Sequence, residues 1–230
     1  MNKTKLTLSL NKTELIVGWI YLALWYLVLP LVAAGICILI GLRSVAAVNL
    51  IYNGMNFVCC CLIFRRMLLE SFDHIRQNRK SLINALVPGF GAYLLSAYVT
   101  GMLIMLLKPD FTNANDAVVH SMVEEFPLLI PLAVIVLVPI AEECLFRGLL
   151  FVPLCRKNRI LGYAVTVVVF SAIHIVGYLD SYDAVSLLIC VMQYAPGAAV
   201  LCWACESSDS LVPPILIHMT INTIGILFAR

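Results

Sequence analysis

The sequence predicts an all-α protein, a polytopic membrane bundle of about seven or eight transmembrane helices in a single integral domain. Of its 230 residues, 62% are hydrophobic and only 12% are charged, whereas soluble domains are nearer half apolar and one quarter charged. The mean hydropathy is +0.99, and several apolar runs reach the roughly 20 residues that a helix needs to cross the hydrocarbon core. We therefore expect a multi-pass protein of the cell membrane, with membrane lipids as its neighbours.

The predicted spans are seven apolar runs, at residues 15–42, 45–64, 82–107, 127–154, 160–178, 185–204 and 211–229. Pro30 is expected to kink or divide the first run, because proline lacks an N–H and clashes with the preceding turn; division would give eight spans. The segments 65–81 and 108–126 are predicted loops that are too short for a soluble domain. His74 and His120 fall in these loops and are expected to be solvated.

Basic residues gather in alternate loops. They are Lys3, Lys5 and Lys12 before the first span, Arg65, Arg66, Arg76, Arg79 and Lys80 between the second and third, and Arg156, Lys157 and Arg159 between the fourth and fifth. By the positive-inside rule, these segments face the cytoplasm. The net charge of +2 is too small to indicate a nucleic-acid partner.

Two other groups of polar residues in the spans have structural interpretations. Asn49, Asn53 and Asn56 recur at helical spacing on the second span, and we expect them to form hydrogen bonds between helices. The nine cysteines lie in or beside apolar runs, where a thiol behaves as a small hydrophobe. Cys202 and Cys205 have the CxxC spacing, but no second pair accompanies them, so a redox or metal role is not favoured.

The fourth run carries three charges in the stretch AEECLFRGLL, residues 141–150. Each charge near the centre of a bilayer costs about 2.5–3.5 kcal/mol on insertion scales. Glu143 and Arg147 are four residues apart, in the order that suits a helical ion pair. Glu142 is turned about 100° away around the helix, so this pair does not neutralise it. A functional role is therefore expected for Glu142.

Two histidines and an asparagine lie at similar depths in other spans. FSAIH places His174 on the fifth span, and HMTIN places His218 and Asn222 on one face of the seventh. At 1.5 Å per residue, Glu142, His174 and Asn222 lie roughly 16–21 Å from the cytoplasmic side, and His218 roughly 10 Å. We therefore predict that these four side chains converge on one site.

Such a set of groups is sufficient to hydrolyse an amide without a covalent intermediate. Desolvation raises the proton affinity of a carboxylate, which suits it to act as a general base on water. A histidine can hold and polarise that water, while a second histidine and an amide donate to the developing oxyanion. Two histidines and a glutamate also form a known zinc ligand set, but the spacing lacks the HExxH form. No cofactor is expected, and zinc is the less favoured alternative.

Three motifs in this half of the chain match those of one protein family. EECLFR has the form EExxxR, FSAIH the form FxxxH and HMTIN the form HxxxN, in that order. The chain thus resembles the CPBP family of intramembrane proteases, also called the CAAX-processing or Abi family. The resemblance covers about residues 127–229. On this view, residues 127–230 are the catalytic core, and residues 1–126 are N-terminal helices of the same bundle.

The resemblance implies a glutamate-dependent endopeptidase that acts on a peptide or a lipid-associated protein. Relatives in bacteria are linked to bacteriocin immunity and peptide processing. By motif, Glu142 would activate the water together with His174, whereas His218 and Asn222 would bind the oxyanion. The ion pair of Glu143 with Arg147 would orient the site.

Three alternatives remain open. The protein could be a non-catalytic bacteriocin-immunity or scaffold protein that acts by binding, or a zinc-dependent variant of the protease. It could also be a transporter with the buried charges as an ion site, although no inverted repeat is visible. Replacing Glu142 with glutamine would separate the first of these from a glutamate enzyme, because binding would survive and catalysis would not.

Overall fold

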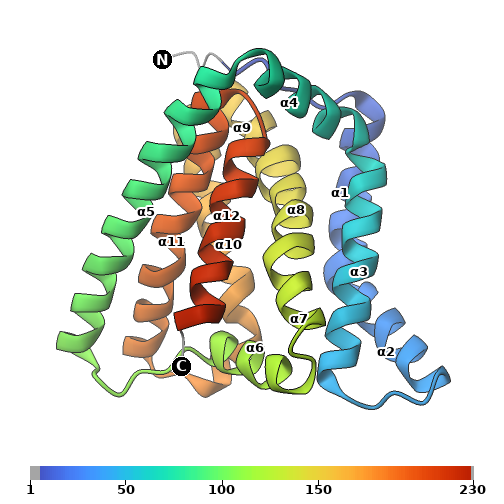
Figure 1. Ribbon diagram of the computed structural model, residues 1–230, viewed down its shortest axis with the longest axis vertical. Helices are drawn as coiled ribbons and strands as arrows, with labels where there is room; N and C mark the ends of the chain where they lie inside the picture. Colours follow the sequence, from blue (N-terminus) through green and yellow to red (C-terminus); the bar gives the residue numbers. More distant parts are fainter. Residues whose placement is uncertain (1–5, 229–230) are drawn as a thin grey trace.

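The computed structural model describes residues 6–228, in which the regular structure is helical throughout. Lys3 and Lys5 lie outside this range. The elements are α1 (Lys12–Leu27), α2 (Leu29–Leu39), α3 (Val45–Ile63), α4 (Arg65–Gln77), α5 (Arg79–Leu107), α6 (Ala114–Glu125), α7 (Leu129–Leu132), η1 (Ala133–Leu137), α8 (Val138–Glu142), η2 (Glu143–Phe151), α9 (Val152–Lys157), α10 (Arg159–Ile175), η3 (Val176–Ser181), α11 (Ala184–Ser208) and α12 (Val212–Phe228). Most of these helices stand side by side as one bundle (Figure 1).

In the described part of the chain, five helical segments are long and apolar enough to cross a membrane: Val45–Ile63, Arg79–Leu107, Leu129–Lys157, Arg159–Ser181 and Ala184–Ser208. The bent pair α1–α2 gives a sixth span if it is counted as one. The last predicted span is the shorter apolar helix Val212–Leu227. All seven predicted runs are therefore helical, and the expectation of an all-α polytopic membrane protein is confirmed.

The first predicted span bends between α1 and α2, as expected from Pro30. The two helices meet at an angle of 55°, and Pro30 stands in the first turn of α2. Because proline has no N–H to donate to the preceding turn, the helical hydrogen bonds are interrupted at this point. The prediction of a kink near Pro30 is confirmed.

The two segments predicted as loops are helices, so that prediction is wrong. In α4, Met67, Ser71 and Ile75 are buried at helical spacing, and α4 lies across one end of the bundle between α3 and α5 (Figure 1). α6 lies at the opposite end (Figure 1). A short helix with one apolar stripe packs well across the end of a bundle. Neither α4 nor α6 is among the helices that are long and apolar enough to cross a membrane.

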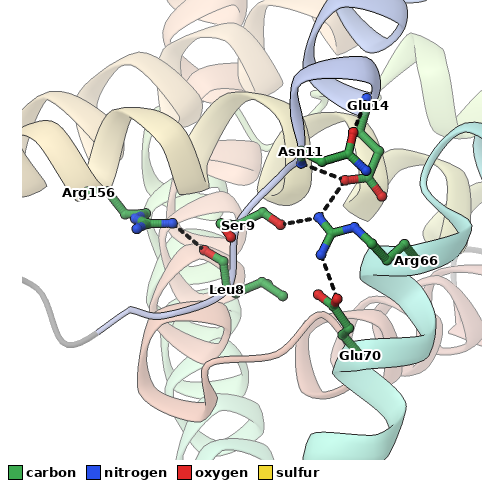
Figure 2. Close-up of polar contacts among 7 residues, drawn as sticks. All are labelled: Leu8, Ser9, Asn11, Glu14, Arg66, Glu70 and Arg156. Carbon is green, nitrogen blue, oxygen red and sulfur yellow. Dashed lines mark hydrogen bonds and ion pairs between the residues drawn. The ribbon is translucent and has the colours of Figure 1, made fainter.

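An extended N-terminal segment is fixed at the end of the bundle that carries α4. Arg66 donates to the carbonyl of Ser9 (2.8 Å) and to Glu14 (2.6 Å), and its other terminal nitrogen reaches Glu70 (2.5 Å), as Figure 2 shows. From the loop before α12, the Asp209 carboxylate accepts from two backbone N–H groups of the same segment. These contacts hold the segment that precedes α1 against the end of the bundle that carries α4.

Buried apolar side chains surround the charged stretch of the fourth span. Residues 141–150 are all buried, and the largest cluster of buried apolar side chains includes Trp25, Phe64, Phe146 and Phe170. Between α1 and α3, the hydroxyl of Tyr21 donates to Asn56 (2.8 Å), so the predicted interhelical hydrogen bond is confirmed for that asparagine. The stretch AEECLFRGLL is therefore the centre of the bundle.

Candidate active site

The site is built on a long helix whose hydrogen bonds change register twice. Two π-helical stretches, η1 and η2, stand on either side of α8, and each is followed by a proline in the first turn of the next helix, Pro139 in α8 and Pro153 in α9. A proline cannot donate to the preceding turn, and the wider π turn accommodates it there. π-Helical turns are often found at functional sites. Glu142 ends α8 and Glu143 begins η2.

Asn222 compensates for the hydrogen bond that Pro139 cannot make. The N–H of Val138 donates to the carbonyl of Ala133, and Pro139 has no N–H, so the carbonyl of Val134 has lost both of its helical donors. The amide nitrogen of Asn222 donates to this carbonyl at 2.8 Å. Asn222 thus ties α12 to η1, and the amide keeps a second N–H that this bond does not use.

Glu143 and Arg147 form the expected ion pair, and both side chains are fully buried. The Nη1 of Arg147 lies 2.9 Å from Oε1 of Glu143. The other terminal nitrogen donates to the carbonyl of Ala198 on α11 (3.2 Å). The guanidinium group also lies over the ring of Phe170 on α10, 4.5 Å from its centroid. The ion pair therefore joins η2 to α10 and α11 in the middle of the bundle.

His218 lies between the two glutamates. Its Nδ1 is 2.8 Å from Oε1 of Glu143, and its Nε2 is 3.8 Å from Oε2 of Glu142. Because the Glu143 carboxylate paired with Arg147 can only accept, Nδ1 must carry a hydrogen. In the neutral ring, Nε2 is then an acceptor that faces another acceptor. A proton or a bridging water between Nε2 and Glu142 would satisfy both groups.

Of the two adjacent glutamates, Glu142 is the one whose carboxylate has no hydrogen-bonded partner for its buried oxygen. Its Oε2 is buried and makes no hydrogen bond, although the carboxylate borders a cavity of about 570 Å³ that His174, His218 and Asn222 also line. A buried polar atom without a partner costs free energy, so this arrangement suits a group that binds water or substrate. The four side chains predicted to converge do meet at one cavity.

His174 approaches the cavity from α10 with a defined tautomer. Its Nδ1 lies 2.8 Å from the carbonyl of Phe170; since a carbonyl only accepts, Nδ1 is the donor. The Nε2 of the neutral ring therefore carries the lone pair and can accept a hydrogen bond. The ring stacks on Tyr194 of α11, with centroids 4.6 Å apart, and this contact fixes the orientation of the imidazole.

Several residues at the α6 end of the cavity were missed by the sequence analysis. The cavity is also lined by Asn113, Asp116, His120 and Tyr178. The expectation that His120 is a solvated loop residue is wrong, because α6 carries it against the cavity, where it is partly buried. The spacing of Val118, Val119 and Met122 is the signal in the sequence that could have predicted this helix.

Asp116 has an unusual environment within the cavity. Its side chain is exposed, so the cavity reaches the surface beside α6. The protein around it nevertheless desolvates the carboxylate and raises its pKa, an effect that His120, the Asn115 side chain and His174 partly offset. Asp116 therefore stands at the mouth of the cavity, with solvent on one side and protein on the other.

Over residues 6–228, no group of three or more His, Cys, Asp or Glu side chains is arranged to hold a metal ion. Glu143 is hydrogen-bonded to both His218 and Arg147, whereas Glu142 lies 3.8 Å from His218. None of the nine cysteines, all of which lie in the described part of the chain, forms a disulfide.

Residues 124–224 match the model of a protein family described as type II CAAX prenyl endopeptidase, Rce1-like. The matched segment contains all six of the residues singled out from the sequence. No curated protein and no solved structure matches the chain.

Proposed function

Since this chain belongs, through residues 124–224, to the CAAX-type family of membrane proteases, we propose that it is an endopeptidase of the cell membrane whose site lies inside the helical bundle. Its substrate is a membrane-associated peptide or a lipid-associated protein. The observation that carries the proposal is the buried, unpartnered Oε2 of Glu142 facing Nε2 of His218 at 3.8 Å, at the edge of a cavity.

In the proposed reaction, Glu142 accepts a proton from a water molecule whose oxygen attacks the scissile carbonyl carbon. The Nε2 of His174, with its lone pair, accepts the other hydrogen of that water and so helps to orient it. A bound water of this kind also satisfies the carboxylate oxygen that the protein leaves unpaired. No covalent bond between protein and substrate is formed.

His218 and Asn222 bind the oxyanion in this proposal. His218 gains a donor at Nε2 when the proton taken up by Glu142 is shared with it, and the Glu143 carboxylate, held in place by Arg147, stabilises the resulting imidazolium through Nδ1. Asn222 offers its second amide N–H. The proton then passes to the nitrogen of the leaving amine as the carbon–nitrogen bond breaks, and the carboxyl product loses its own proton to solvent.

The test compares host cells that express wild type, Glu142→Gln or Glu125→Gln at matched levels. Peptide termini in the membrane and secreted fractions would be measured by mass spectrometry. Glu125 is exposed and does not border the cavity, so its variant controls for loss of a carboxylate. We expect new termini with wild type and with Glu125→Gln, and none with Glu142→Gln.

The same termini produced by Glu142→Gln would contradict the assignment of the base. If no new termini arise from any folded variant, while a host phenotype persists with Glu142→Gln, the protein acts as a binding or immunity protein. Loss of activity on removing a stoichiometric zinc ion from the purified protein would instead establish a metal enzyme.

A further inference from the structure

The cavity carries a second carboxylate that the proposed reaction does not use. Among the described residues that line it, the acidic side chains are Glu142 and Asp116, and no lysine or arginine is present. No lysine or arginine among residues 6–228 forms an ion pair with Asp116 either. The cavity therefore offers a carboxylate at its mouth that no described lysine or arginine neutralises.

The backbone that carries Asp116 is held firmly against α11. The side chain of Asn113, the N-cap residue just before α6, donates to Gln193 (2.9 Å) and to the hydroxyl of Tyr194 (3.0 Å). The N–H of Ala114 donates to the hydroxyl of Tyr182 at 2.5 Å. Because Asp116 lies in the first turn of this helix, these three hydrogen bonds set its position.

The same contacts connect Asp116 to the proposed catalytic groups. Tyr194, which accepts from Asn113, stacks on His174 with the ring planes 27° apart. Asp116 is also close enough to His174 for the two to influence each other electrostatically. A substrate that reaches Glu142 from this opening must therefore pass Asp116, at a fixed place relative to His174.

Three tyrosines that line the cavity lie within electrostatic range of this carboxylate. Tyr93, Tyr178 and Tyr194 line the cavity together with Asp116. The π faces of tyrosine attract ammonium and guanidinium groups, and a carboxylate provides the opposite charge. Such a combination of groups recognises a cation.

We propose that Asp116 and these tyrosines bind a positively charged group of the substrate, an amine or a guanidinium, next to the scissile bond. The inference rests on the proposed function and names its substrate class. The peptide would carry lysine, arginine or a free amino terminus on this side. The described lining holds no lysine or arginine that would pair with a terminal carboxylate, so the cation subsite is the feature that selects the peptide.

Binding of peptides to the purified, cleavage-deficient Glu142→Gln protein tests this inference. The probes are three synthetic peptide libraries, blocked at both ends and identical except for a central lysine, norleucine or glutamate. They would be measured with Glu142→Gln alone and combined with Asp116→Asn or with Asp110→Asn. Asp110 is an exposed carboxylate six residues earlier that does not line the cavity.

We expect the lysine library to bind at least about tenfold more tightly than the norleucine library, a difference of about 1.4 kcal/mol. Asp116→Asn should remove this preference and leave norleucine binding unchanged, whereas Asp110→Asn should retain it. A lysine preference that is absent, or that survives in folded Asp116→Asn, would overturn the proposal. Because binding is measured without catalysis, this result is independent of whether wild type proves to be a protease.

Discussion

The ion pair of Glu143 with Arg147 gives the sharpest prediction about stability. Replacing Arg147 with methionine keeps most of the side-chain volume and removes the charge. The Glu143 carboxylate would then be fully buried with His218 as its remaining partner. The carbonyl of Ala198 would lose a donor, and Phe170 would lose the cation over its ring.

The expected loss is about 3–5 kcal/mol, because removing one member of a buried pair leaves an uncompensated charge. For a chain of this length, each kcal/mol corresponds to about 2–4 °C in Tm. Thermal unfolding of the detergent-purified protein should therefore show a fall of roughly 6–20 °C. A matched control is Glu70→Gln, which breaks the exposed pair of the same spacing with Arg66 and should cost less than about 1 kcal/mol.

The double variant Glu143→Gln with Arg147→Met separates the charge effect from a loss of packing. With neither charge present, more than half of the lost stability should return, although the proposed activity should not. The reasoning would be refuted if the single variant Arg147→Met lost less than about 2 kcal/mol relative to wild type. It would also be refuted if the double variant were no more stable than the single variant.

Three further predictions concern other contacts of the structure. Gly162→Ala should destabilise the protein by about 1–3 kcal/mol, because the new Cβ would lie 2.7 Å from the backbone of Cys155; chemical or thermal unfolding measures this. Asn222→Leu should cost about 1–3 kcal/mol, since it removes the donor to a carbonyl that a proline has left unpaired. The salt bridge and hydrogen bond from Lys108 hold the pKa of Asp183 well below its usual range; the stabilisation is therefore present above the ordinary pKa of about 4 and lost as the pH falls. Lys108→Met should raise that pKa, which NMR titration of the carboxyl would show.

The first two of these predictions have a matched control in the same chain. Gly91→Ala places its Cβ where no atom lies within 4 Å, so it should be neutral or stabilising by up to about 1 kcal/mol. Thr223→Val removes a hydroxyl that donates within its own helix and should cost less than Asn222→Leu. If a variant and its control lose the same stability, the contact named for that variant is not the cause. An unchanged Asp183 titration in Lys108→Met would contradict the third prediction.

The sequence by itself determined the all-α membrane class, the seven apolar runs, the bend at Pro30 and the pairing of Glu143 with Arg147. These features depend on the apolar length of a segment or on contacts within one turn, and both can be read along the chain. The motif order also indicated that Glu142, His174, His218 and Asn222 belong together. Their separation in sequence left the distances among them undetermined.

Only the tertiary structure decided how the polar groups are partnered. The bond of Asn222 to the carbonyl of Val134 joins α12 to η1, where the π turn and Pro139 leave that carbonyl without a helical donor. The sequence does not show that these two segments, far apart along the chain, lie side by side. α6 was predicted as a loop because it is short and polar, and its position under the cavity comes from contacts that Asn113 makes with α11. Short helices are stabilised by packing more than by propensity. For this reason, only the tertiary structure shows that the carboxylate of Asp116 borders the cavity.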